Sequence, residues 1–238
     1  MNTVHMEDPQ GCNFLFKHED IMATARPSKT PKPRATYHHG DLRAALVEAG
    51  LALAREGGPQ AVVLREATRR AGVAPNAAYR HFAGHPALFE AVRAAALGAL
   101  ARAIEQEMQQ AEALPDPAAR ARGLLAAVGR GYLGFAQAET GWFLTAFASG
   151  AFDVQAPTDP ARTAGKGLNP FELLNYALDA MVQAGVLPPE RRPGAEFLAW
   201  SSVHGMALLA IDGPLRRAPL AVRAALGARL LRMVETGL

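Results

Sequence analysis

Residues 37–88 read YHHGDLRAALVEAGLALAREGGPQAVVLREATRRAGVAPNAAYRHFAGHPAL. In the middle of this stretch, apolar residues recur at the three-to-four-residue spacing of a helix; they are Val63, Leu64, Ala67 and Ala71. Gly72 and Val73 then interrupt the spacing with a glycine that tolerates positive φ and an apolar residue that can turn inward. Pro75 follows where the first turn of a helix accepts a missing N–H. The stretch therefore predicts a helix-turn-helix.

The segment PNAAYRHF, residues 75–82, is predicted to be the second helix of this pair. Ala78 and Phe82 are four residues apart, so they share a face that packs on the preceding helices. The opposite face has polar and aromatic side chains that suit phosphate oxygens and base edges; they are Asn76, Tyr79, Arg80 and His81. A helical hairpin in any all-α protein can contain the same corner, so the corner alone leaves both DNA binding and plain packing open.

The whole stretch resembles the TetR family of one-component transcriptional regulators. The similar parts are YHHGDLR at the start, the Gly57-Gly58 pair, LREATRRAGV around the corner, AAYRHF in the second helix and HPALFEAV after it. The resemblance implies that Tyr79 and His81 contact phosphates and that Arg80 reads bases together with the start of the second helix. The full set of DNA-contacting residues expected on this basis is Ala74, Pro75, Asn76, Ala77, Tyr79, Arg80, His81 and His85.

Three residues depart from the pattern of the family. Val63 stands where the family has a Ser or Thr that caps a helix and touches a phosphate. Thr68 stands where a small Ala is usual at the helix crossing, and His85 replaces a common Lys. The first and third departures weaken expected contacts with the DNA backbone, so they concern affinity for DNA rather than the fold.

The charge is unevenly distributed along the 238 residues. Residues 24–93 have eleven Lys or Arg against five Asp or Glu, whereas residues 94–238 have thirteen of each. A basic amino-terminal third joined to a neutral remainder is typical of a nucleic-acid-binding module attached to another domain. With 50% hydrophobic residues the chain can bury a sizeable core, and its length allows one or two domains.

Residues 1–36 are predicted to be a disordered basic tail, because they lack apolar periodicity and combine prolines with Arg and Lys. A minor-groove arm is the functional alternative, and Met22 is an alternative natural start. Cys12, the only cysteine, cannot form an internal disulfide. The sequence has neither a signal peptide nor an apolar run long enough to span a membrane, so we expect a cytoplasmic protein without a membrane partner.

Residues 37–85 are assigned to a helix-turn-helix DNA-binding domain and residues 86–238 to a helical ligand-binding and dimerisation domain. Further helices are predicted over 86–114, 118–138, around 142–147, 170–185, 194–212 and 219–236, with a loop over 150–169. No run alternates apolar and polar residues for long enough to require a strand. The fold class is therefore all-α, with a three-helix DNA-binding head and a helical-bundle body.

The segment FLAWSSVHGMALLAIDG resembles the carboxy-terminal domain of a TetR subgroup named for its Trp-His-Gly motif, here Trp200, His204 and Gly205. Trp200 and His204 are one turn apart and share a helix face. A largely apolar effector pocket is expected where residues of separate helices gather; the candidates are Trp142, Phe143, Phe147, Phe171, Leu174, Trp200 and, as polar anchor, His204. The alternative interpretation is that these residues, His204 included, are core.

Catalysis is the rival class of function. None of the seven histidines belongs to an H-E-x-x-H motif, and C-x-x-C, G-x-S-x-G and G-x-G-x-x-G are all missing. The pair His38-His39 has no carboxylate or cysteine cluster beside it, so no metal site, cofactor or catalytic residue is predicted. An all-helical enzyme and a small-molecule carrier without DNA binding are the alternatives.

The sequence thus predicts a ligand-responsive regulator, a repressor, that binds a double-stranded, pseudo-palindromic DNA operator as a homodimer and is released by a small hydrophobic effector. The last two predicted helices have more apolar positions than a neutral body of this length should leave exposed, which indicates a dimer interface; they are Leu198, Met206, Leu209, Leu220, Leu226, Leu230 and Met233.

Overall fold

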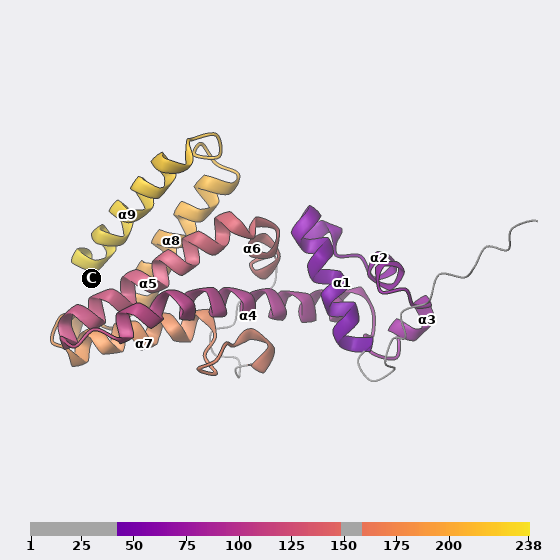
Figure 1. Ribbon diagram of the computed structural model, residues 1–238, viewed down its shortest axis with the longest axis horizontal. Helices are drawn as coiled ribbons and strands as arrows, with labels where there is room; N and C mark the ends of the chain where they lie inside the picture. The colour runs from indigo at the N-terminus through magenta and orange to yellow at the C-terminus, as the bar shows by residue number, and fades with distance from the viewer. Residues whose placement is uncertain (1–41, 149–158) are drawn as a thin grey trace, which may run out of the picture. The chain divides into compact units, whose positions relative to one another are not determined.

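The computed structural model describes residues 42–148 and 159–238, and all of its regular elements there are helical (Figure 1). The helices are α1 Leu42–Gly57, α2 Leu64–Arg70, α3 Pro75–Ala78, α4 His85–Glu112, α5 Pro117–Ala138, α6 Thr140–Ala146, α7 Pro170–Gln183, α8 Ala195–Ile211 and α9 Leu220–Gly237. Three 3₁₀ turns occur at Pro59–Ala61, Pro160–Arg162 and Pro189–Arg191. The all-α prediction is confirmed for this part of the chain, whereas the predicted tail, residues 1–36, lies outside it.

Two clusters of buried residues share the long helix α4. One cluster joins α1, α2 and α3 to the first half of α4, and includes Leu46, Val62, Ala78, Phe82, Leu88, Val92 and Leu97. The other joins the second half of α4 to α5, α7, α8 and α9, and includes Leu100, Ile104, Met108, Leu124, Leu173 and Leu178. The helix α4 is therefore the common support of the predicted head and the predicted body.

Local sequence signals define most helix ends. Asp116 caps α5 by accepting a 2.7 Å hydrogen bond from the backbone N–H of Ala119, and Pro117 occupies the first helical position. Asn169 and Glu172 form a capping box at the start of α7. The starts of α5 and α7 lie within one residue of the predicted starts at 118 and 170. The agreement is close because caps and prolines act on adjacent backbone groups.

The helices α4 and α5 approach each other closely at a glycine. A Cβ added to Gly131 would lie 2.7 Å from the Cα of Ile104, so only glycine permits this crossing. The segment after residue 158, predicted as part of a loop, is held against α4 as well: the carboxylate of Glu105 accepts hydrogen bonds from the backbone N–H groups of Gly165 and Lys166. None of the described helices combines the length and the apolar character that crossing a membrane would require.

Candidate nucleic-acid interface and effector cavity

The corner between α2 and α3 has the geometry expected of a helix-turn-helix. Gly72 has a φ of +71°, in the left-handed region where glycine is favoured. The backbone N–H of Gly72 donates to the carbonyl of Arg69, and that of Val73 donates to the carbonyl of Thr68 at 3.0 Å. These bonds use the last carbonyl groups of α2 and turn the chain sharply before Pro75, the first residue of α3.

The second helix is shorter than the predicted segment 75–82. Regular α-helix covers Pro75–Ala78 only, and the chain continues in tighter turns through hydrogen bonds from Arg80 N–H to the Ala77 carbonyl and from His81 N–H to the Ala78 carbonyl. Ala78 and Phe82 are buried, as their spacing predicts. The guanidinium of Arg43 lies 5.3 Å from the centre of the Phe82 ring and covers it.

The opposite face of this segment is open to solvent. Tyr79 is 61% exposed, and Ala77 is the one candidate of residues 74–81 that is half-buried. The exposed candidates are Ala74, Pro75, Asn76, Tyr79, Arg80 and His81. An aromatic side chain exposed to this degree gains little from the core, so it is available to a binding partner.

His85 stands apart from the other DNA candidates because its ring is already used. Its Nε2 lies 2.7 Å from the carbonyl oxygen of Val62, and its ring stacks on Phe89 with centroids 5.9 Å apart. Since a carbonyl only accepts, Nε2 is the donor in this contact. The visible role of His85 is to join the start of α4 to the segment before α2.

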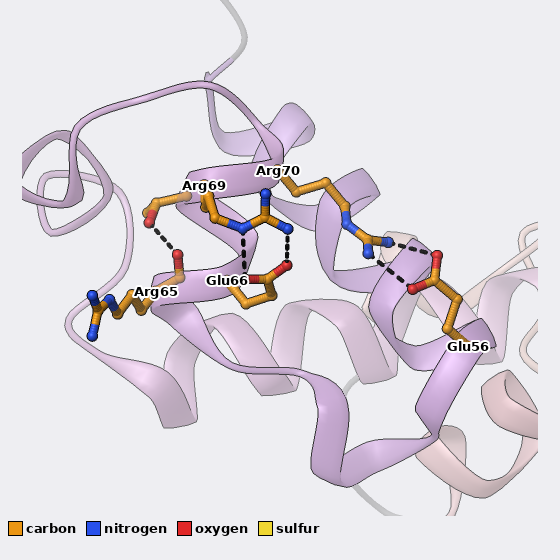
Figure 2. Close-up of polar contacts among 6 residues, drawn as sticks. Glu56, Arg65, Glu66, Arg69 and Arg70 are labelled. Carbon is orange, nitrogen blue, oxygen red and sulfur yellow. Dashed lines mark hydrogen bonds and ion pairs between the residues drawn. The ribbon is translucent and has the colours of Figure 1, made fainter. Parts of the chain in front are cut away.

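The arginines of α2 differ in their partners (Figure 2). Arg69 forms a bidentate pair with Glu66, and Arg70 forms one with Glu56 of α1 at 2.8 Å. These hydrogen bonds hold the pKa of Glu66 and of Glu56 below the usual range of a glutamate. Arg65 is exposed, has no carboxylate partner among the described residues and points away from both pairs in Figure 2. Sequence reasoning did not single out Arg65.

Val63 precedes α2 as its N-cap residue. Its φ of −113° and ψ of 129° are those of an extended cap, and no side-chain hydrogen bond closes the helix end. Val63 is 46% exposed. The absence of a cap at this residue follows directly from the replacement of a hydroxyl side chain by an aliphatic one.

The helix α6 is fastened to α1 by four interactions. The indole Nε1 of Trp142 donates to the carbonyl of Leu51 at 2.7 Å. The guanidinium of Arg55 lies 4.3 Å over the Trp142 ring and forms a bidentate pair with Glu139. At Gly141, an added Cβ would overlap the carbonyl oxygen of Ala54, so the two backbones touch. We call this contact the α1–α6 joint, and Trp142, predicted for the effector pocket, belongs to it.

A cavity lies among α5, α7, α8 and α9. The space between its lining atoms, counted out to its open mouth, is about 580 Å³. Its lining is almost entirely apolar: Leu125, Ala126, Val128, Gly129, Tyr132, Phe147, Pro170, Phe171, Leu174, Ala199, Trp200, Val203, Leu231 and Val234. A lining of this composition suits a small apolar molecule.

Four of the seven predicted pocket residues line this cavity, namely Phe147, Phe171, Leu174 and Trp200. The other three, Trp142, Phe143 and His204, do not. Phe143 is fully buried, with its ring edge-on to Tyr132 at 5.4 Å between centroids. The sequence pattern thus located the region of the cavity. It did not distinguish the residues that line the cavity from the core residues next to them.

Tyr132 brings a polar group to the lining of the cavity, and its hydroxyl contacts His204. The hydroxyl of Tyr132 lies 2.7 Å from Nδ1 of His204, and Nε1 of Trp200 donates to the same hydroxyl oxygen at 3.2 Å. Burial raises the pKa of Tyr132 far above its usual value and lowers the pKa of His204. Both rings are therefore held in their neutral forms.

Sequence reasoning missed Tyr132 and the small residues of the lining, such as Gly129 and Ala199. Tyr132 lies within the predicted helix 118–138, where helical periodicity counts it only as an apolar position. A signal was present in the hydroxyl itself, because a buried tyrosine requires a hydrogen-bond partner, although the sequence does not identify that partner.

A further feature is the exposed apolar surface of α8 and α9. Large apolar side chains there remain accessible to solvent: Phe197, Leu198, Leu208, Leu209, Leu220, Val222, Leu226 and Met233. Leu198, Leu209, Leu220, Leu226 and Met233 were among the residues predicted for a dimer interface. No group of three or more potential metal ligands occurs in the described ranges.

Two family profiles match the sequence. The profile described as bacterial regulatory proteins, tetR family, matches residues 46–92, and the profile described as tetracyclin repressor-like, C-terminal domain, matches residues 125–234. The second match spans the Trp200, His204 and Gly205 motif. Together the two matches cover more than half of the chain. No sequence among the curated proteins matches significantly.

Solved structures with this fold come from several bacteria. A protein of unknown function from Rhodococcus sp. RHA1 is 26% identical, with a TM-score of 0.61 over 84% of this chain and 98% of the other. FadR from Bacillus subtilis in complex with stearoyl-CoA is 12% identical, with a TM-score of 0.52 over 82% and 99%. A TetR variant from Acinetobacter baumannii AYE in complex with minocycline is 18% identical, with a TM-score of 0.52 over 82% and 94%.

Proposed function

The chain belongs to the TetR family of bacterial transcriptional regulators, and from this premise we propose that it is a ligand-responsive repressor. In this proposal a homodimer binds a pseudo-palindromic operator and blocks transcription in the cytoplasm until a small apolar effector enters the cavity. The observation that carries the proposal is the exposed face of residues 74–81, which follows a helix-turn-helix corner inside the residues matched by the DNA-binding profile.

Two heads would place their α3 segments in successive major grooves, about 34 Å apart on one side of the duplex. Tyr79 and His81 would contact phosphates, while Arg80 and the residues from Ala74 to Ala77 would face base edges. The unpaired cation of Arg65 supports the same surface, because Arg69 and Arg70 are already occupied by carboxylates. We assign residues 37–85 to the DNA-binding domain and residues 86–238 to the body.

The exposed apolar side chains of α8 and α9 support a homodimer. An isologous interface would pair these two helices with the same helices of a second copy and so remove their apolar surface from water. Met233 is 59% exposed and Leu209 is 46% exposed in the single chain. Such a dimer would fix the separation of the two heads.

The apolar cavity supports regulation by a small molecule. Two similar structures were solved in complex with ligands, minocycline in one and stearoyl-CoA in the other. An effector that prefers one shape of the body would shift the protein toward that shape and weaken operator binding by linkage. The helix α4 would transmit the change, since its two halves pack in the head and in the body.

Selection of bound sequences from a random DNA pool tests the proposal and identifies an operator in one experiment. We expect a pseudo-palindromic site whose binding weakens steeply with added salt, because counterions return to the phosphates as the protein leaves. Recovery of no enriched sequence, or affinity that is independent of salt, would contradict the DNA-binding assignment.

A further inference from the structure

We propose that the effector is an uncharged molecule with a flat apolar frame and one hydroxyl or N–H group that donates to the phenolic oxygen of Tyr132. The inference rests on the proposed function in one respect, namely that the cavity among α5, α7, α8 and α9 is the effector site. It adds the chemical class of the ligand and the atom that recognises it.

The described lining of the cavity has no charged side chain. No Asp, Glu, Lys, Arg or His is among the described residues that line it, and the polar side-chain atoms there are the Tyr132 hydroxyl and the Trp200 indole N–H. An ion that entered would lose its hydration without gaining a partner of opposite charge. The lining therefore selects against carboxylates, phosphates and ammonium groups.

The start of α7 lies at the cavity but offers no free donor to an anion. Pro170 and Phe171, at the start of α7, line the cavity, and a helix start is normally a site for anions because its N–H groups are unpaired. Here Pro170 has no N–H, while the N–H groups of Phe171 and Glu172 both donate to Oδ1 of Asn169 at 2.9 and 3.0 Å. The capping box leaves an acidic ligand no donor.

The hydrogen bonds of the Tyr132 cluster leave one acceptor position on the hydroxyl oxygen. The Trp200 N–H can only donate, so it occupies one lone pair of the Tyr132 oxygen. If the Tyr132 O–H donates to Nδ1 of His204, the hydroxyl proton and the Trp200 N–H both have partners inside the protein. If His204 donated instead, the Tyr132 proton would have no partner within this cluster while the cavity is empty, which is less favourable than an unfilled lone pair. Tyr132 thus offers the ligand one acceptor lone pair.

The aromatic part of the cavity favours a flat ligand. The rings of Phe147, Phe171 and Trp200 form its aromatic walls, with centroids 6.3 Å apart for Phe147 and Trp200 and 5.8 Å apart for Phe171 and Trp200. Aromatic walls favour flat apolar frames through offset and edge-on contacts.

Three probes that share one frame test the inference: 4-butylphenol, 4-butylanisole and 4-butylbenzoate. Their binding to the full chain without DNA is measured by calorimetry near neutral pH, where the phenol is uncharged and the benzoate is an anion. We expect the phenol to bind about three- to ten-fold more tightly than the ether, the value of one net hydrogen bond. The benzoate should bind at least about ten-fold more weakly than the ether.

Two variants locate the effect. Tyr132→Phe should bind the phenol and the ether equally, because the acceptor oxygen is gone. Tyr176→Phe is the matched control: Tyr176 is 43% exposed on α7 and is not in the cavity lining, so the preference should persist. The comparison of the three probes on the unmodified protein needs no variant, and it stays decisive if Tyr132→Phe fails to fold.

The inference is overturned if the ether or the benzoate binds as tightly as the phenol, if the preference survives in Tyr132→Phe, or if none of the probes binds up to its solubility limit. Operator affinity is measured separately with each probe. Binding in the expected order without any shift of operator affinity would refute the proposed regulation and leave the chemistry of the cavity intact.

Discussion

Replacement of Gly141 by alanine should destabilise the protein through the α1–α6 joint. An added Cβ would overlap the carbonyl oxygen of Ala54 and lie 2.8 Å from that of Arg55. Both atoms belong to the backbone of α1, so neither can move aside as the tip of a side chain would. The two helices must separate to admit one methyl group.

The size of the effect follows from the contacts that this separation breaks. Relief of the overlap requires a shift on the order of 1 Å, and the 2.7 Å hydrogen bond from Trp142 to the Leu51 carbonyl would then exceed the length of a hydrogen bond. Its loss costs about 0.5–1.5 kcal/mol, and overpacking costs about 1–3 kcal/mol. The free energy of unfolding should fall by about 2–4 kcal/mol, which lowers Tm by roughly 5–15 °C in a chain of this size.

Thermal unfolding followed by circular dichroism measures the shift. Gly134→Ala is the control, because a Cβ at Gly134, in the last third of α5, meets no atom within 4 Å. This variant should gain about 0.5–1 kcal/mol from the lower backbone entropy of alanine in a helix. A Gly141→Ala protein that melts as the parent does would refute the close packing of α6 on α1.

Four further predictions concern the DNA surface, the helix cap, the dimer and pH. Tyr79→Ala should weaken binding to all DNA sequences alike, whereas Arg80→Ala should relax base preference by about 1–3 kcal/mol at one position; competition assays with mutated operators separate the two. Val63→Thr should add the missing cap of α2 while keeping a β-branched side chain, and so raise stability by about 0.5–1 kcal/mol; a lower Tm would mean that Val63 is needed as an apolar contact. Met233→Glu should place two like charges in the proposed interface, and light scattering should then report the 25.2 kDa monomer in place of a dimer. Because the pKa of His204 is lowered in the folded protein, the unfolded chain binds a proton on this ring more readily than the folded chain does. The stability that depends on the neutral ring is therefore fully present above about pH 6.5 and is lost as the pH falls toward the folded pKa. The slope of the unfolding free energy against pH should be smaller in His204→Gln than in the parent, and equal slopes would contradict the burial of the ring.

The sequence predicted the helices and the corner well because their signals are local. Gly72, Pro75 and Pro117 each act on neighbouring backbone groups, and the burial of Ala78 and Phe82 follows from their spacing. The shortness of α3 was not predictable in the same way, since the choice between an α-turn and a tighter turn after Ala78 depends on small differences in hydrogen-bond geometry.

Contacts between distant segments explain what was missed. The indole of Trp142 binds a carbonyl 91 residues earlier in the chain, and the hydroxyl of Tyr132 meets a histidine 72 residues later. Helical periodicity assigns each residue to a buried face, but it does not state which helix lies opposite. For this reason an aromatic set was recognised, while its division between the α1–α6 joint, the core and the cavity wall required the structure.

The helix α4 is one uninterrupted run of 28 residues, which at 1.5 Å per residue is about 42 Å long. In a rigid helix of that length, a small tilt at one end produces a large displacement at the other end. If the body tilts one end by about 5°, the other end moves by roughly 3.7 Å, close to the ~3.4 Å that each base pair occupies along the axis of the DNA helix. A rotation small enough to leave the side chains of α4 and α5 interlocked would thus move a recognition segment by about one base pair.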